Sequence, residues 1–457
     1  MIKRIAGGIA AVLVLGLVGF QFTATSRHFL PSGTGIVAKQ LCSLTWVSGL
    51  DTDYAREIYL DPLLGGAGPL ISHSVNDERR SVSAGVFGLF WNRTATYREG
   101  LGCTLVHQPR TFDAQLTVPF AQEFDPFTLD TTHRDAHFDT DALTAAIEGA
   151  FDDPQADVRH TLGVAVFHQG RLVGEHYAPQ ASRETRFHGW SMTKSTMATL
   201  AGVLQHQGRI DIHETGAIPA LRDARDDRRN ITISHLLRMT GGLEMMEYND
   251  GYDPNSQMLF TQTDMAAFAA RARRLHQPGD HWQYMSGDTI LASSAMQAQL
   301  GDDLVEQTLA LRAELFEPLG IGNAVMEPDQ SGTFQGSSYM YATAHDWARL
   351  ALLYANNGQV GETRLLPEDW YDVVSRPTDG SDGAYGMGFW LPSDGDGLPA
   401  DTIMLSGFQG QWGYVMPSED LVVVRFGATV GVNSRSGRLA QAILAAKRTS
   451  DGTETAD

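Results

Sequence analysis

Basic residues are in short supply in this chain. The sequence holds 34 lysines and arginines against 54 aspartates and glutamates, so the formal net charge is −20. No run of clustered basic residues interrupts this acidity. Because a protein neutralises phosphates with such clusters, the composition argues against nucleic acid as a partner. The excess of acidic residues otherwise indicates little beyond solubility.

Cysteine is scarcer still, with only Cys42 and Cys103, both in the first quarter of the chain. Two ligands without partners at usable spacing do not make a metal site. In an oxidising compartment such a pair is a candidate disulfide. Two buried free thiols are the alternative, since cysteine is often simply buried.

One long apolar stretch stands at the N-terminus. Lys3 and Arg4 precede an uncharged segment from Ile5 to Phe22, which is typical of an export signal whose positive flank stays in the cytoplasm. We expect residues 1–26 to be either an anchor in the inner (cytoplasmic) membrane or a cleaved signal ending near Ala24. Either alternative places the rest of the chain on the periplasmic or extracellular side, and the anchor is the preferred one.

Composition changes divide the remaining chain into three parts. Residues 27–130 are irregular and carry both cysteines, and we expect an extension of strands and loops with few helices. Residues 131–447 carry regular patterns and form the predicted main domain. Residues 448–457 form a polar tail that we expect to be disordered.

Hydrophobic periodicity predicts the fold of the main domain. A hairpin pattern with a Gln-Gly turn comes first, helical patterns fill a long middle, and three strands and a helix end the domain. The predicted strands cover residues 162–168, 171–177, 402–406, 411–416 and 421–427, and the last helix covers 436–447. The simplest assembly is an α+β fold: one antiparallel sheet flanked by helices, with a helical subdomain inserted between its halves.

The lysine distribution draws attention to one position. Lys194 is the only lysine between the extension and the C-terminal helix, and it lies three residues after Ser191 at the start of a predicted helix. Residues at this spacing share a helical face, so the amine can reach the hydroxyl. A buried lysine can become a neutral base, whereas arginine cannot lose its proton. The pair therefore predicts a nucleophilic serine activated by a lysine.

At these residues the sequence resembles the serine β-lactamases and penicillin-binding proteins. The segment Ser-Met-Thr-Lys at 191–194 is similar to their first motif, Tyr284-Met-Ser286 to the second, and Leu405-Ser406-Gly407 to the third. The resemblance spans residues 141–447 and implies the β-lactamase/transpeptidase-like fold.

The resemblance also implies roles for individual residues. Tyr284 is expected to be a second base that passes a proton to the leaving group, and Ser286 to hydrogen-bond within the site. The backbone N–H groups of Ser191 and Phe408 are expected to bind the oxyanion. Ser406 and Gly407 are expected to line the path of the substrate.

Leu405 departs from the family pattern, because a lysine or histidine usually stands there and supplies charge for a substrate carboxylate. The chain is therefore most similar to the class C-type members that act as 6-aminohexanoate-dimer hydrolases and esterases, which cleave linear amides or esters of small molecules. The alternatives are a D-Ala-D-Ala carboxypeptidase or β-lactamase, and a non-catalytic, membrane-tethered binding protein.

Other signals are weaker. Glu244, Glu247, Asp250 and Asp253 form an acidic segment that we interpret as a solvated loop rather than a specificity loop. His188 and His235 lie near the motifs, and we interpret both as structural. The sequence lacks a His-Glu-x-x-His zinc motif and a phosphate-binding glycine loop, so we expect no metal and no cofactor. Nothing in the sequence specifies an oligomeric state.

Overall fold

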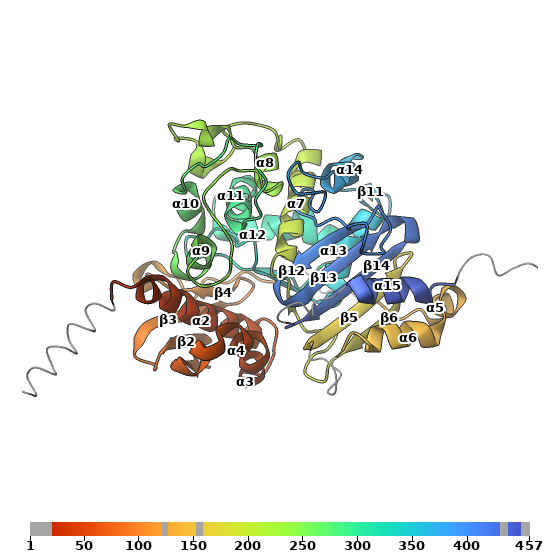
Figure 1. Ribbon diagram of the computed structural model, residues 1–457, viewed down its shortest axis with the longest axis horizontal. Helices are drawn as coiled ribbons and strands as arrows, with labels where there is room; N and C mark the ends of the chain where they lie inside the picture. Colours follow the sequence, from red (N-terminus) through yellow and green to blue (C-terminus); the bar gives the residue numbers. More distant parts are fainter. Residues whose placement is uncertain (1–20, 121–126, 152–158, 430–436, 449–457) are drawn as a thin grey trace, which may run out of the picture.

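Figure 1 shows a computed structural model of the chain, in which residues 21–120, 127–151, 159–429 and 437–448 are described. A twisted sheet stands between two groups of helices, a helical region lies beside it, and the N-terminal extension packs beneath that region. The α+β fold expected from the sequence is therefore confirmed.

The central sheet has five antiparallel strands in the order β12-β13-β14-β5-β6. Their bounds are Thr161–His168 for β5, Arg171–Tyr177 for β6, Ile403–Gly407 for β12, Gln411–Met416 for β13 and Leu421–Gly427 for β14. Strands from the two ends of the domain meet where β14 pairs with β5, with Val423 opposite Val166. A single sheet built from both ends of the domain was predicted, without its strand order. The pairing brings the β12 end of the sheet next to the helical region.

The β5–β6 hairpin illustrates how local sequence sets the fold. Gln169 and Gly170 both have positive φ, 50° and 72°. A two-residue turn with this backbone matches the twist of the flanking strands, and glycine adopts it without steric cost. The predicted hairpin therefore forms in the expected register, with His168 opposite Arg171.

Helices cover both faces of the sheet. One face packs against α6 and α15 through apolar side chains such as Leu143 and Ile443. The other packs against α13 and, near β12, against α7. The bounds are Thr131–His137 for α5, Thr140–Glu148 for α6, Met192–His206 for α7, Ala344–Ala355 for α13 and Gly437–Ala446 for α15. Asp130, Asp139 and Thr343 cap α5, α6 and α13 by accepting backbone N–H bonds.

The helical region is inserted in the sequence between β6 and β12, as predicted, and lies beside the sheet in space. Its helices are α8 (Ile233–Leu237), α9 (Pro254–Thr261), α10 (Met265–Ala270), α11 (Ser286–Gln297), α12 (Leu304–Leu311) and α14 (Trp370–Ser375). Two small sheets accompany these helices. One consists of β7 (Phe187–His188), β8 (Val325–Met326) and β9 (Met340–Ala342), and the other of β10 (Gln359–Val360) and β11 (Thr363–Arg364).

The extension differs from the expectation of strands and loops with few helices. Its main element is α2 (Leu30–Trp46), followed by the short helices α3 (Thr52–Ala55) and α4 (Asp61–Leu64). A four-stranded sheet packs on α2 and consists of β1 (Ile71–Asn76), β2 (Ser81–Val86), β3 (Phe90–Arg98) and β4 (Gly102–Leu105).

Local sequence did not predict α2, because Gly33 and Gly35 in its first half are poor helix formers. Fourteen of its 17 residues are buried, and the glycines permit this close packing. A Cβ on Gly35 would lie 2.5 Å from the Phe260 carbonyl oxygen of α9, so only glycine fits there.

Two connections fasten the extension to itself and to the main domain. The predicted disulfide joins Cys42 of α2 to Cys103 of β4, with the Cα atoms 6.0 Å apart. Beside it, Lys39 forms a fully buried ion pair with Glu327, and the lysine also donates to the Cys103 carbonyl oxygen over 2.7 Å. The boundary at residue 130 stays a prediction, since one apolar cluster runs through both parts.

The expected anchor or signal at 1–26 falls mainly on residues 1–20, which lie outside the described residues, as does the expected disordered tail after residue 448. Among the helices that are described, none is both long and apolar enough to cross a membrane.

Candidate active site

Ser191 stands at the start of α7, where the N–H groups of Met192 and Thr193 donate to the carbonyl oxygens of Gly189 and Trp190 in the preceding turn. One turn later, Lys194 places its Nζ atom 3.0 Å from the Ser191 Oγ. The structure thus brings together the two residues that the sequence paired. The N-terminal end of a 15-residue helix also favours negative charge that develops at this point.

The Lys194 amine is buried and fully surrounded by oxygen acceptors. Besides Ser191, it donates to the Ser286 Oγ and to the Ser337 carbonyl oxygen, each over 3.0 Å. Only 1% of the lysine is exposed. Burial lowers the pKa of Lys194 to about 8, and the nearby Glu247 carboxylate opposes that shift. About a tenth of the amine is therefore neutral at pH 7 and able to accept a proton.

Tyr284 covers the Lys194 amine, with 4.9 Å between Nζ and the ring centroid. The phenol packs edge-on against Tyr385 and tilted against Trp390. Burial raises the pKa of Tyr284 well above its usual value, Glu247 and Tyr385 add to the rise, and a hydrogen bond with Ser191 opposes it. Tyr284 is therefore protonated at neutral pH and has a proton to donate.

The end of β12 forms the wall opposite α7. A Cβ on Gly407 would lie 2.1 Å from the Gly189 carbonyl oxygen, so glycine alone lets this strand approach the loop before Ser191. Ser406 and Gly407 line the cavity beside Ser191. Phe408 follows them at the rim, with its ring edge-on to Trp190 at 5.5 Å. Leu405 points into the core and is fully buried.

Glu247 is a site residue that sequence reasoning missed. Its carboxylate accepts hydrogen bonds from the backbone N–H and the hydroxyl of Ser286, each over 2.8 Å. It also lines the cavities next to Ser191. The interpretation of its segment as a solvated loop is therefore wrong for Glu247, and also for Asp253, which is buried and caps α9. An acidic loop carries no local signal that distinguishes these two residues.

The two histidines near the motifs have structural hydrogen bonds, as we interpreted them. His188 is buried between the Gln40 amide of α2, 2.8 Å away, and the Ser338 carbonyl oxygen, 2.7 Å away. His235 forms a capping box with Thr232 at the start of α8.

The extension also reaches the residue before the nucleophile. Trp190 has a positive φ of 46°, and its indole N–H donates to the Gln409 side chain over 3.2 Å. Gln409, also at positive φ, donates in turn to the Tyr59 carbonyl oxygen of the extension over 2.9 Å. Both walls of the site are therefore tied to the extension, which no motif indicated.

Two cavities meet at Ser191. The first, of about 150 Å³, lies between the extension and α9, and the second, of about 290 Å³, lies against β12. The apolar lining of the first comprises Phe29, Ile36, Leu63, Leu64, Trp190, Leu259, Phe260 and Phe408. The second is lined by aromatic and small residues, among them Tyr284, Trp390, Gly407 and Trp412. No described residue that lines either cavity is a lysine, arginine or histidine.

Comparison with known proteins agrees with this geometry. Residues 147–447 match the Beta-lactamase family, so the chain belongs to that family. It is a serine hydrolase of the β-lactamase type. The chain is 24% identical over 291 residues to the 6-aminohexanoate-dimer hydrolase of Paenarthrobacter ureafaciens. The aligned region covers 57% of this chain and 70% of that hydrolase.

Solved structures share the fold. A penicillin-binding protein homologue from Caulobacter crescentus superimposes with a TM-score of 0.54 at 18% identity, covering 71% of this chain and 100% of its own. A family VIII carboxylesterase gives a TM-score of 0.53 at 15% identity, again covering 71% of this chain and 100% of its own.

Proposed function

We propose that the chain hydrolyses a linear amide or ester of a small molecule through an acyl-enzyme on Ser191. The observation that carries this proposal is the contact between the Ser191 hydroxyl and the buried Lys194 amine, 3.0 Å apart, where burial lowers the lysine pKa to about 8. A serine hydroxyl needs such a base because it is a weak nucleophile at neutral pH.

The reaction follows from the protonation states of the three groups. Neutral Lys194 takes the proton of the Ser191 hydroxyl as its oxygen attacks the carbonyl carbon. The N–H groups of Ser191 and Phe408 hold the oxyanion, and Tyr284 gives its proton to the leaving amine or alcohol. Lys194 returns a proton to Tyr284. Water then attacks the acyl-enzyme by the same groups in reverse, releasing the acid and restoring Ser191.

The linings of the two cavities support a substrate class. The first cavity is apolar on the extension side and has about the volume of an engineered cavity that holds benzene. We infer that it takes an apolar acyl chain of about four to six carbons. The lining carries the carboxylates of Glu247 and Asp250 and no lysine or arginine among the described residues, so a substrate carboxylate is disfavoured there.

The Cys42–Cys103 disulfide supports a place outside the cytoplasm, since disulfides persist in oxidising compartments. We propose that the N-terminal segment at 1–26 exports the chain and holds it at the inner membrane, with the active site on the periplasmic or extracellular side.

The test is covalent labelling of the full chain in mild detergent with a fluorophosphonate, read by intact mass. We expect one adduct, which disappears in Ser191→Ala. The same preparation is then offered p-nitrophenyl esters of increasing acyl length, linear amides and a chromogenic cephalosporin. Ester or amide turnover that is lost in Ser191→Ala supports the proposal.

Preferred turnover of the cephalosporin would instead identify a β-lactamase. A folded protein that forms no adduct and turns over nothing would identify a binding protein. Thermal unfolding of Ser191→Ala serves as the control that the fold is intact.

A further inference from the structure

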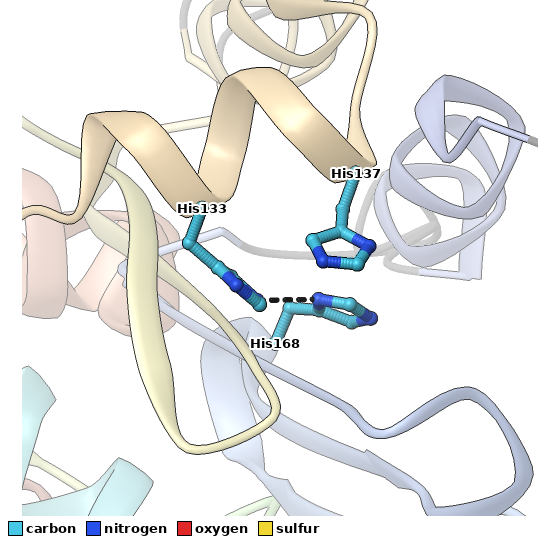
Figure 2. A group of neighbouring side chains, drawn as sticks. All are labelled: His133, His137 and His168. Atoms are coloured by element: carbon cyan, nitrogen blue, oxygen red, sulfur yellow. Dashed lines mark hydrogen bonds between the residues drawn. The ribbon is translucent and has the colours of Figure 1, made fainter.

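Three histidines meet on the face of the sheet that packs against α5 and α6, apart from Ser191. His133 and His137 lie one turn apart on α5, and His168 is the last residue of β5. Figure 2 shows the three imidazole rings pointing toward one another from these two elements. One ring nitrogen of each lies within 4.8 Å of those of the other two.

The rings are already in contact. Their centroids are 4.3 Å apart for His133 and His137, 4.9 Å for His137 and His168, and 5.1 Å for His133 and His168. His133 Nε2 and His168 Nδ1 are hydrogen-bonded at 2.9 Å, whereas the His137 ring has no hydrogen-bond partner among the described residues. Nitrogen ligands of one tetrahedral zinc ion stand about 3.4 Å apart, given Zn–N bonds of about 2.1 Å. Metal binding therefore requires the rings to rotate so that the three nitrogens, now within 4.8 Å of one another, reach that spacing.

We propose that His133, His137 and His168 bind one divalent transition-metal ion, such as Zn²⁺ or Cu²⁺. Imidazole is the side chain that these ions prefer among nitrogen ligands. Three protein ligands leave a fourth position for water, and the half-exposed His133 and His137 leave a path by which the ion enters.

Each imidazole binds the ion in its neutral form. Two cations near the rings, Lys447 and Arg171, oppose a metal ion, but both are paired with carboxylates. The Lys447 amine lies 2.6 Å from Glu419, and Arg171 lies 2.7 Å from Asp130.

A bound ion would also join α5 to the sheet. Asp130 caps α5 and pairs with Arg171 of β6 over 2.7 Å, so the helix is already aligned on the hairpin. Phe138 packs edge-on against the His168 ring at 5.3 Å. None of the three histidines lines a cavity at Ser191, so the site is separate from the hydrolase reaction.

The test measures metal directly on the full chain, in mild detergent and without a polyhistidine tag. After equilibrium dialysis against Zn²⁺, elemental analysis is expected to find one ion per chain. His137→Ala removes a half-exposed ligand and should weaken binding at least about tenfold. The matched control is His276→Ala, from the exposed pair His276 and His281, whose rings are also in contact at 4.1 Å.

Two further measurements keep the result interpretable. The Cu²⁺ complex should show nitrogen hyperfine coupling by electron paramagnetic resonance, and His133→Ala should change that spectrum. Zn²⁺ should raise the thermal unfolding midpoint of the wild-type chain but not that of His137→Ala. Equal binding by wild type and His137→Ala, or no binding by wild type, would overturn the proposal. Fluorophosphonate labelling of Ser191 should be the same with and without a chelator, which separates the two proposals.

Discussion

Two parts of the chain with very different sequence character surround Ser191. The family-matched part, residues 147–447, supplies Ser191, Lys194, Tyr284 and the β12 wall, each in a short motif. The extension supplies four of the eight apolar side chains named above for the first cavity, and the Tyr59 contact that holds Gln409, with no motif at all. Chemistry needs particular atoms at fixed spacing, whereas an apolar wall needs only suitable volume. The reaction is therefore readable from sequence, and the fit to a substrate is not.

The largest expected effect tests the part of the chain that carries the motifs. Lys194→Arg keeps the positive charge but removes the base, because arginine does not lose its proton. We expect kcat/KM for a p-nitrophenyl ester to fall by about 10²–10⁴-fold. Lys447→Arg, which keeps its ion pair with Glu419 at the surface, is the matched control and should leave the rate unchanged. An active Lys194→Arg enzyme would assign the base to another group.

The next effect tests the ion pair that connects the extension to the main domain. Glu327→Gln leaves the Lys39 ammonium fully buried without a carboxylate, which costs about 3–5 kcal/mol of unfolding free energy. Urea unfolding measures the loss. Adding Lys39→Met should recover part of it, because both charges are then gone.

The exposed pair of Arg273 and Glu244 provides the contrast. Arg273→Ala should change the unfolding free energy by no more than about 1 kcal/mol, since exposed pairs contribute little. Equal losses for the buried and the exposed pair would show that the extension is not fastened through Lys39.

A smaller effect tests the extension as a substrate wall. Ile36 lies on α2 and lines the apolar cavity, so Ile36→Trp should fill part of it. We expect the ratio of kcat/KM for the hexanoyl ester to that for the acetyl ester to fall by about 10–200-fold. Val75→Trp, on the exposed side of β1, is the control of equal size. An unchanged ratio in Ile36→Trp would place the acyl chain in the cavity against β12.

The smallest effect concerns pH. The neutral form of Lys194 is the base and its pKa is about 8, so kcat/KM should rise with pH and level off above that value. The rate at pH 7 should be about a tenth of the plateau, because about a tenth of the amine is then neutral. Glu247 raises the pKa of Lys194, so Glu247→Gln should move the rise to lower pH. A rate that falls across this range would contradict a neutral lysine base.

Most of the main domain was predictable, and most of the extension was not. The hairpin at 161–177 and the three C-terminal strands are short apolar runs bounded by turn residues, and the helix after Ser191 repeats apolar residues at three- and four-residue steps. α2 was not predicted, because Gly33 and Gly35 in its first half are poor helix formers. The contacts that Lys39 and Gln409 make join segments hundreds of residues apart, and neither residue has a local pattern that points to its partner. Glu247 and the three histidines were missed for the same reason.

The separation of Lys39 and Glu327 has a bearing on how the chain matures. The two residues are 288 positions apart, so during synthesis α2 is complete long before its counter-ion exists. The Cys42–Cys103 bridge spans only 61 positions and can close early, holding α2 against β4 in the interval. The lysine can enter the interior only when the segment carrying Glu327 arrives, since an unpaired ammonium is costly to bury. We therefore expect the extension to dock only after the far half of the chain has been synthesised. A complete active site then forms only when both halves have folded together.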